Sequence, residues 1–302
     1  MVIGVPRYDT ISFITDYGTT DEFVGVVKSV VRDLAPHVSV IDLTHDIPRF
    51  DVRAGSLALA RCVGYLPSGV VLAVVDPGVA TNRRAVAIEV AGGAGVMVGP
   101  DNGLLAPGVA MAGGAERAVE LTNPEFHLEA PGATFAGRDV FAPVAAHLCN
   151  GVELTDFGPE IDPVLLLPAT VPLPRPDGAD LVVEVLWVDH FGNSQLNVGP
   201  DDLPEHLTGD VTLRIGNPMP GKDGVVRRAR RAGSFAQLGR GEVGLVLDSY
   251  GMLAVCLDQR SAAEELGLEA GDQVVLSPAD AEPAASTPVA LGRPPSSTSR
   301  HG

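Results

Sequence analysis

A proline-rich segment divides this chain into two halves with different sequence patterns, and no other feature limits the possible folds as strongly. From Leu165 to Asp180 the sequence runs LLLPATVPLPRPDGAD, with four prolines in sixteen residues. Such a segment is stiff and predicts a connector between two domains. We expect an N-terminal domain over residues 1–168, a linker over 169–180, a second domain over 181–278 and a disordered tail over 279–302.

The half before the linker alternates short apolar runs with helical patterns, which is typical of strands and crossover helices in a largely parallel sheet. Strands are expected at residues 10–15, 38–43, 69–75, 85–90 and 96–98, and helices at 54–65 and 139–148. A further helix follows the DYG turn, capped by Thr20 or Asp21, because apolar residues from Phe23 to Leu34 recur at three- and four-residue spacing. The sequence therefore predicts an α/β N-terminal domain.

The half after the linker has short alternating runs with turn residues between them, at residues 181–188, 211–215, 243–247, 252–256 and 273–276. This pattern favours a smaller, all-β C-terminal domain that is barrel-like or a sandwich. The dense basic run Arg227, Arg228, Arg230 and Arg231 is short and poor in aromatic residues, so we interpret it as a solvated or structural segment.

Charge and cysteine usage exclude several classes of function. The chain has 38 acidic and 21 basic side chains and a net charge of −17, so it is expected to bind neither nucleic acid nor anionic membranes. No apolar run reaches the roughly 18 residues of a membrane span, and no leader pattern opens the chain, so a cytoplasmic protein is expected. Cys62, Cys149 and Cys256 lack zinc-site spacing and read as small buried hydrophobes.

Several aspartates lie at or just after the C-terminal ends of the predicted parallel strands, where open α/β sheets bind their ligands. They are Asp16, Asp42, Asp46 and Asp76. The loop DYGTTDE carries three carboxylates and no lysine, which disfavours a phosphate and favours a polyhydroxylated or cationic ligand. Asp16 suits a vicinal diol such as ribose, and Asp21 suits an ammonium or sulfonium group unless it serves as a helix cap.

Three other clusters each have a functional and a structural interpretation. Asp76 and Arg83 stand seven residues apart across a Pro-Gly turn, either as a carboxylate held to orient water or as a salt bridge that pins the turn. The trio in DLTHD, made of Asp42, His45 and Asp46, could ligate a metal, but turn-stabilising roles are favoured. The segment WVDHFGNSQLN offers a Phe and an Asn that suit a purine, although FGN is also an ordinary hairpin turn.

Seven segments, in order along the chain, together resemble one family. They are ITDYGTTDEFVG, DLTHDIPRFDVRAG, VVDPGVATNRR, VGPDNGLL, TFAGRDVFAP, VDHFGNSQLN and DSYGMLAV. The family is the S-adenosylmethionine hydroxide adenosyltransferases, the adenosine-forming S-adenosylmethionine hydrolases, which are similar to fluorinating and chlorinating enzymes acting on the same substrate. The resemblance extends from Ile11 to about Leu276.

The resemblance implies an α/β domain, a β-barrel-like domain and a homotrimer with each active site between one subunit's N-domain and its neighbour's C-domain. It implies S-adenosylmethionine as substrate, adenosine and L-methionine as products, and neither a cofactor nor a metal. By motif, Asp76 and Arg83 would order the water that attacks the ribose 5′ carbon. The substrate-binding positions implied by the motifs are Asp16 for the ribose hydroxyls, Asp21, Asp189 and Ser249 for the methionine end, Phe50 and Phe235 as walls, Asn193 for adenine, and their motif neighbours Phe191 and Tyr250.

This chain departs from the family pattern at one position that bears on catalysis. The hydroxide-transferring members typically read TFHGRD, and here Ala136 replaces the histidine that completes the water site. His127 or His45 could substitute for it. Gly137 stands where fluorinating enzymes offer a halide-binding hydroxyl, and a carboxylate at Asp76 favours water over halide. Hydrolysis is the leading hypothesis; the alternatives are a halide-dependent synthase, a non-catalytic binding protein and a metal-dependent hydrolase.

Overall fold

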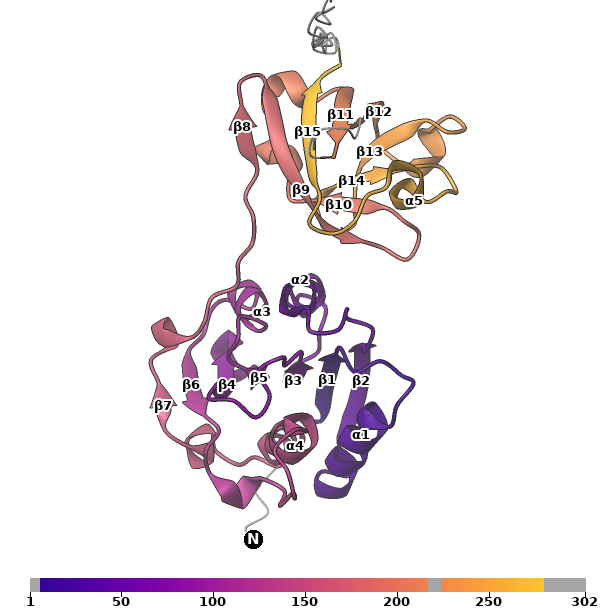
Figure 1. Cartoon of the computed structure of the whole chain (residues 1–302). Coiled ribbons are helices and arrows are strands. Elements are labelled where there is room, and N and C mark those ends of the chain that lie inside the picture. Colours follow the sequence, from indigo (N-terminus) through magenta and orange to yellow (C-terminus); the bar gives the residue numbers. More distant parts are fainter. Residues whose placement is uncertain (1–5, 217–223, 280–302) are drawn as a thin grey trace, which may run out of the picture. The chain divides into compact units, whose positions relative to one another are not determined.

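The computed structural model describes residues 6–216 and 224–279, and the chain divides into two compact units after Pro172 (Figure 1). The division falls inside the segment predicted as the linker, where a short strand, β8 (Arg175–Asp177), also forms. The predicted tail lies outside the described residues from residue 280 onward.

A seven-stranded sheet forms the centre of the first unit, in the order β2-β1-β3-β5-β4-β6-β7. The strands are β1 (Thr10–Thr15), β2 (Ser39–Thr44), β3 (Gly69–Val74), β4 (Ala85–Val90), β5 (Gly95–Pro100), β6 (Arg117–Glu120) and β7 (Glu160–Ile161). Strands β2, β1, β3 and β5 pair in parallel, and β4, β6 and β7 extend the sheet in antiparallel fashion. The predicted α/β domain with a largely parallel sheet is confirmed.

Helices cover both faces of this sheet (Figure 1). Helices α1 (Phe23–Leu34) and α4 (Ala142–Cys149) lie on one face, and α2 (Val52–Val63) and α3 (Ala106–Met111) lie on the other. Successive side chains of a strand point to opposite faces, so Leu72 of β3 packs into the core beneath α1 and α4, whereas Ala73 packs into the core on the opposite face. This explains why β3 is apolar throughout.

Two helix starts differ from the prediction. The residue that precedes α1 is Glu22, not Thr20 or Asp21, and its side chain makes no capping hydrogen bond. Ahead of α4, residues Gly137–Phe141 form a π-helical turn. Pro143 has no N–H for the carbonyl of Asp139, which instead accepts a hydrogen bond from Leu128 N at 2.8 Å.

The second unit is a closed barrel of seven strands, which confirms the barrel-like prediction. Its strands follow the order β10-β14-β13-β12-β11-β15-β9, and a β10–β9 pairing closes the ring, with β8 added beside β9. The elements are β9 (Asp180–Val188), β10 (Ser194–Leu196), β11 (Val211–Ile215), β12 (Val225–Ala232), β13 (Val243–Leu247), β14 (Leu253–Cys256), α5 (Ala262–Leu266) and β15 (Gln273–Pro278).

Both units also contain short 3-10 turns. In the first unit they lie at Ala91–Gly93, Pro124–Phe126, Leu154–Phe157 and Pro163–Leu165, and in the second at Pro200–Asp202, Glu205–Leu207 and Phe235–Gln237.

The basic run lies in β12, a strand the sequence pattern did not predict. Arg228 pairs with Asp210 at 3.2 Å and Arg230 with Glu242 at 3.4 Å, which supports a structural role. Cys149 and Cys256 are buried, as expected, and Cys62 is half-buried. Within the part of the chain that the structure describes, no helix is long and apolar enough to cross a membrane.

Candidate active site

A cavity of about 450 Å³ lies at the C-terminal ends of the parallel strands of the first unit. It gathers the three carboxylates that the sequence singled out at strand ends and in the loop after β1, namely Asp16, Asp21 and Asp76. The other lining residues are Tyr17, Phe23, Arg49, Phe50, Val79, Thr134, Phe135, Ala136 and Gly137. The chain thus brings six predicted site residues together in one place.

Asp76 and Arg83 form the ion pair that their spacing predicted. Arg83 Nε lies 2.9 Å from Oδ1 of Asp76, and Nη2 lies 2.5 Å from Oδ2. The guanidinium also lies over the ring of Phe141, 5.2 Å from its centroid. Because the Asp76 side chain is only 6% exposed and that of Arg83 15%, the pair has one geometry, and the carboxylate presents a fixed acceptor to the cavity.

The carboxylate of Asp16 is held by a main-chain N–H group. The N–H of Phe50 donates to Oδ2 of Asp16 at 2.9 Å. Phe50 has φ of 66°, a left-handed conformation that costs an ordinary residue roughly 1–2 kcal/mol, and its ring is 71% exposed. The second oxygen of Asp16 makes no hydrogen bond to the described residues, so it can accept one from a ligand.

Tyr17 packs between aromatic side chains beside this carboxylate. Its ring lies 5.7 Å from that of Phe23 and 5.8 Å, edge to face, from that of Phe135. Its hydroxyl reaches Gly137, where a Cβ would collide with the phenol oxygen and lie 3.1 Å from Cζ. Burial, with the nearby charges of Asp16 and Asp76, raises the pKa of Tyr17 well above its usual value, so the phenol stays protonated at neutral pH.

Neither candidate histidine replaces the imidazole missing at Ala136. His45 and His127 are not among the residues that line the cavity. His45 is buried, with Nδ1 2.9 Å from Thr15 Oγ1 and Nε2 3.2 Å from Asp42 Oδ1. Burial lowers the pKa of His127.

His45 instead holds the loop that carries the site. Its carbonyl accepts from Gly18 N at 2.7 Å, and its partner Thr15 accepts from Tyr17 N at 3.2 Å. Lys28 Nζ lies 2.9 Å from the second oxygen of Asp42. In the supposed metal trio, the side chains of Asp42 and His45 are thus already paired, and the main-chain N–H of Asp46 donates to Thr44 Oγ1 at 3.1 Å, which supports the turn-stabilising interpretation.

The barrel has a cavity of its own, of about 490 Å³. It contains three residues that the motifs predicted, Phe191, Asn193 and Phe235, together with Leu257, Asp258, Gln259, Arg260 and Ser261. The rings of Phe191 and Phe235 are 75% and 45% exposed, so both present bare aromatic surface. Such surface suits a planar, partly polar ligand.

The predicted FGN turn is a hairpin between β9 and β10. The Asp189 carboxylate accepts from Phe191 N at 2.9 Å and from Asn193 N and Nδ2 at 2.8 Å each. Gly192, with φ of 82°, lies so close to Ser261 that a Cβ would collide with it. The hairpin-turn and purine-binding interpretations of this segment are therefore compatible, because the turn itself exposes the Phe191 side chain.

Four predicted residues line neither of these cavities: Arg83, which pairs with Asp76 of the first one, and Asp189, Ser249 and Tyr250. Asp189 is occupied by its own turn, and Asp248 binds Tyr250 N at 2.8 Å and Met252 N at 3.0 Å in the same way. Their substrate roles stay predictions. The pattern missed Tyr17, although it adjoins Asp16, and it missed the 257–261 segment, which carries no motif.

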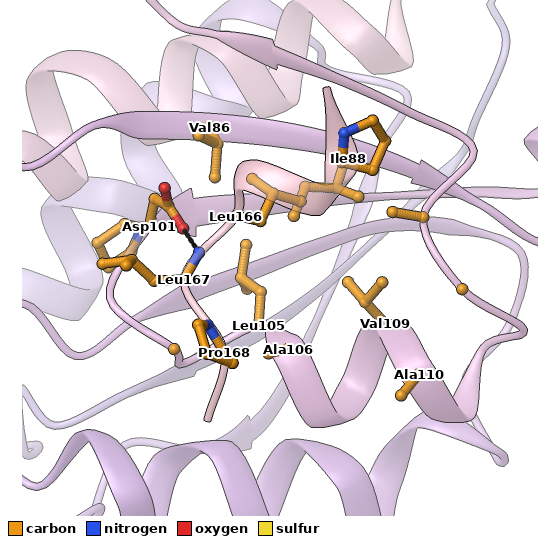
Figure 2. Close-up of a pocket in the computed structure, with 15 residues that line it drawn as sticks. Val86, Ile88, Asp101, Leu105, Ala106, Val109, Ala110, Leu166, Leu167 and Pro168 are labelled. Atoms are coloured by element: carbon orange, nitrogen blue, oxygen red, sulfur yellow. Dashed lines mark hydrogen bonds between the residues drawn. The ribbon is translucent and has the colours of Figure 1, made fainter. Parts of the chain in front are cut away.

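Another cavity of the first unit, of about 310 Å³, is lined mainly by apolar residues of α3, β4 and the 163–168 segment (Figure 2). Its one acidic lining residue, Asp101, accepts from Leu167 N at 2.8 Å and from Arg84 Nε at 2.9 Å. Because its carboxylate is already paired, Asp101 anchors the chain that leads to the linker.

Comparison with known proteins decides the family. Residues 11–158 match the SAM hydroxide adenosyltransferase N-terminal domain, and residues 183–275 match the corresponding C-terminal domain. The chain belongs to the SAM hydroxide adenosyltransferase family. Among relatives of this family, an (R)-S-adenosyl-L-methionine hydrolase of Salinispora tropica is 45% identical over 87% of this chain and 96% of its own length.

More distant relatives include both activities considered from the sequence. An (R)-S-adenosyl-L-methionine hydrolase of Thermus thermophilus is 40% identical over 87% of this chain and 98% of its own length. A fluorinase of Nocardia brasiliensis is 30% identical over 89% of this chain and 96% of its own. The crystal structure of an uncharacterized conserved protein from Thermotoga maritima superposes with a TM-score of 0.78 and 31% identity, covering 88% of this chain and 99% of that one.

Proposed function

We propose that this protein hydrolyses S-adenosyl-L-methionine to adenosine and L-methionine. The observation that carries the proposal is the cavity that gathers Asp16, Asp21 and Asp76 at the ends of the parallel strands. Its support from outside the chain is that relatives 40% and 45% identical to it are (R)-S-adenosyl-L-methionine hydrolases. Two of the carboxylates suit the ribose hydroxyls and the ammonium group of such a substrate, and the third suits water.

The substrate's diol and cationic groups match the acids of the first unit. Asp16, with one oxygen fixed by Phe50 N, has its second oxygen left to accept from the ribose hydroxyls. Asp21 offers a negative charge to the ammonium group of the methionine end. The exposed ring of Phe50 supplies an apolar wall beside the ribose.

The reaction is a displacement at the ribose 5′ carbon. Water oxygen forms the new bond to C5′ while the bond from C5′ to sulfur breaks, and its electron pair stays on sulfur. The leaving thioether is neutral, so no general acid is needed, and the proton released from water passes to solvent. Asp76, oriented by Arg83, accepts a hydrogen bond from the water and aligns it, which is the main contribution the protein has to make.

Two features disfavour halide as the nucleophile. The carboxylate of Asp76 repels an anion. The space at Gly137, where a halide-binding hydroxyl would be carried, is taken by the phenol of Tyr17. A non-catalytic binding protein is the second candidate, and the observation that favours it is Ala136 in the place of the family histidine.

We propose further that the protein acts as a homotrimer, with the first-unit cavity of one subunit completed by the barrel cavity of its neighbour. In support, the family resemblance implies this arrangement, and the aromatic residues suited to adenine, Phe191 and Phe235, belong to a different unit from the acids suited to ribose. A cytoplasmic location is also proposed, because Cys62, Cys149 and Cys256 are free thiols.

One assay tests the activity. The purified protein is incubated with S-adenosyl-L-methionine in halide-free buffer with a strong chelator, and nucleosides are separated by chromatography. Adenosine is the expected product. A 5′-halo-adenosine that forms only when chloride or fluoride is added would establish the synthase, and binding without turnover would establish the binding protein. Loss of turnover in chelator, restored by a metal, would establish a metallohydrolase. Sedimentation showing a fully active monomer would refute the trimer.

A further inference from the structure

We propose that the hydroxyl of Tyr17 orients the attacking water in the place left by the missing imidazole at Ala136. This inference rests on the proposed hydrolysis and adds to it a residue that contacts the reacting water. It accounts for how a chain without the histidine retains a polar partner for Asp76 at that end of the cavity.

The Tyr17 hydroxyl lies beside the position of the missing histidine. Tyr17, Asp76, Ala136 and Gly137 line one cavity. A Cβ at Gly137 would collide with the Tyr17 hydroxyl and lie 3.3 Å from Cε2, so the phenol fills the space directly beside the residue that replaces histidine. Glycine at 137 is therefore what admits this hydroxyl.

The Tyr17 side chain is held rigidly. The Tyr17 ring is packed by Phe23 and Phe135, which themselves meet edge to face at 4.9 Å. The main-chain N–H of Tyr17 is held by Thr15 Oγ1 at 3.2 Å, and that hydroxyl is in turn fixed by His45. A side chain whose ring is packed and whose main chain is fixed keeps its polar atom in one place, which is the requirement for orienting a nucleophile.

The Tyr17 hydroxyl is available to a molecule in the cavity. The Tyr17 hydroxyl makes no hydrogen bond to any residue within the ranges 6–216 and 224–279, so its donor and acceptor capacity remains for a molecule in the cavity. A water bound there can donate one hydrogen to Asp76 and the other to the phenol oxygen. Its lone pair is then left for C5′.

The protonation state limits what Tyr17 does. A phenol that stays protonated at neutral pH is no general base, and it keeps its own proton throughout the step. The water proton leaves along the hydrogen bond to Asp76 and from there to solvent. Tyr17 thus acts by orientation alone, and its removal affects turnover more than substrate binding.

The test compares Tyr17→Phe with the wild-type protein. The substitution removes the hydroxyl and keeps the ring between Phe23 and Phe135. We expect kcat for adenosine release to fall by about 10- to 100-fold through loss of orientation, with the Kd for S-adenosyl-L-methionine changed less than twofold and the melting temperature retained. Tyr65→Phe, which removes an exposed phenol of the same unit, is the matched control and is expected to leave kcat unchanged.

The outcomes separate this inference from the proposed function. A wild-type protein that releases no adenosine overturns both. An active wild type with Tyr17→Phe within twofold of its kcat overturns only the role of Tyr17. As a second measurement, Tyr17→Phe is made together with Ala136→His; a penalty reduced below threefold supports replacement of the imidazole, and an undiminished penalty contradicts it.

Discussion

The guanidinium of Arg83 donates hydrogen bonds from two nitrogens to the carboxylate of Asp76, at 2.9 and 2.5 Å. Asp76→Asn removes the charge that attracts the water's proton and leaves Arg83 buried without a counter-ion. We expect kcat to fall by on the order of 10²-fold and the free energy of unfolding to drop by about 3 kcal/mol. Adenosine release and urea denaturation measure the two effects.

Asp101→Asn is the matched control for that variant. Asp101 is similarly buried and paired with Arg84, but it lies in the separate apolar cavity of the same unit (Figure 2). We expect a comparable loss of stability with kcat within twofold of wild type. An equal fall in kcat in both variants would mean that the Asp76 effect reports damage to the fold.

Ala136→His restores the imidazole of the family motif. If that group acts as a general base, turnover rises by about 10²- to 10⁴-fold, and the gain appears as pH rises through about 6.5, where imidazole loses its proton. The pH profile of kcat/KM for both proteins checks this. Added imidazole is expected to give a partial gain in turnover of the wild type, because Ala136 lines the open cavity. No gain in either experiment would exclude a general-base role for an imidazole at position 136.

Gly137→Ala tests the steric fit between the helix start and Tyr17. The new methyl collides with the phenol oxygen, so we expect a loss of about 1–3 kcal/mol in unfolding free energy. Tyr17→Phe is expected to relieve most of that loss in the double variant. Gly132→Ala, whose Cβ would meet no atom within 4 Å, is the control and should change stability by less than about 0.5 kcal/mol. Additive losses in the denaturation cycle would contradict the contact.

Acid is expected to weaken the first unit through two histidines. Burial lowers the pKa of His147 and of His127 in the folded chain, so the unfolded chain, with pKa near 6.5, binds protons first as pH falls. Stability is therefore constant well above pH of about 6.5 and declines below it. Urea midpoints against pH measure this, and His147→Phe, which keeps the ring contact with Phe126, should flatten the decline. An unchanged slope would exclude His147 as a cause.

The sequence predicted the first cavity well because strand ends are local features. Asp16 directly follows β1 and Asp76 lies two residues beyond β3, and parallel strands end at the same edge of a sheet, so their meeting follows from the pattern alone. The ion pair between Asp76 and Arg83 could likewise be predicted, because a loop of seven residues can fold back and bring its two ends together.

Other features depend on tertiary packing and could not be predicted from the local sequence pattern. The contact between Tyr17 and Gly137 joins residues 120 positions apart, and only the fold brings them together. Strand β12 was missed because its outward arginines, such as Arg228, hide the alternation that its buried Ala229 belongs to. The 257–261 segment connects β14 to α5 and lines the barrel cavity, but no motif in the sequence predicts this position.

The carboxylates of the first cavity act on substrate and products unequally. The sulfonium substrate carries a net positive charge, whereas adenosine and zwitterionic methionine carry none. Asp16, Asp21 and Asp76 therefore attract the entering cation, and the part of that attraction due to the sulfonium charge is lost once the carbon–sulfur bond breaks. The ribose hydroxyls and the ammonium group keep their proposed contacts with Asp16 and Asp21. The reaction thus weakens the electrostatic binding of what it produces, and we expect adenosine and L-methionine to bind less tightly than S-adenosyl-L-methionine.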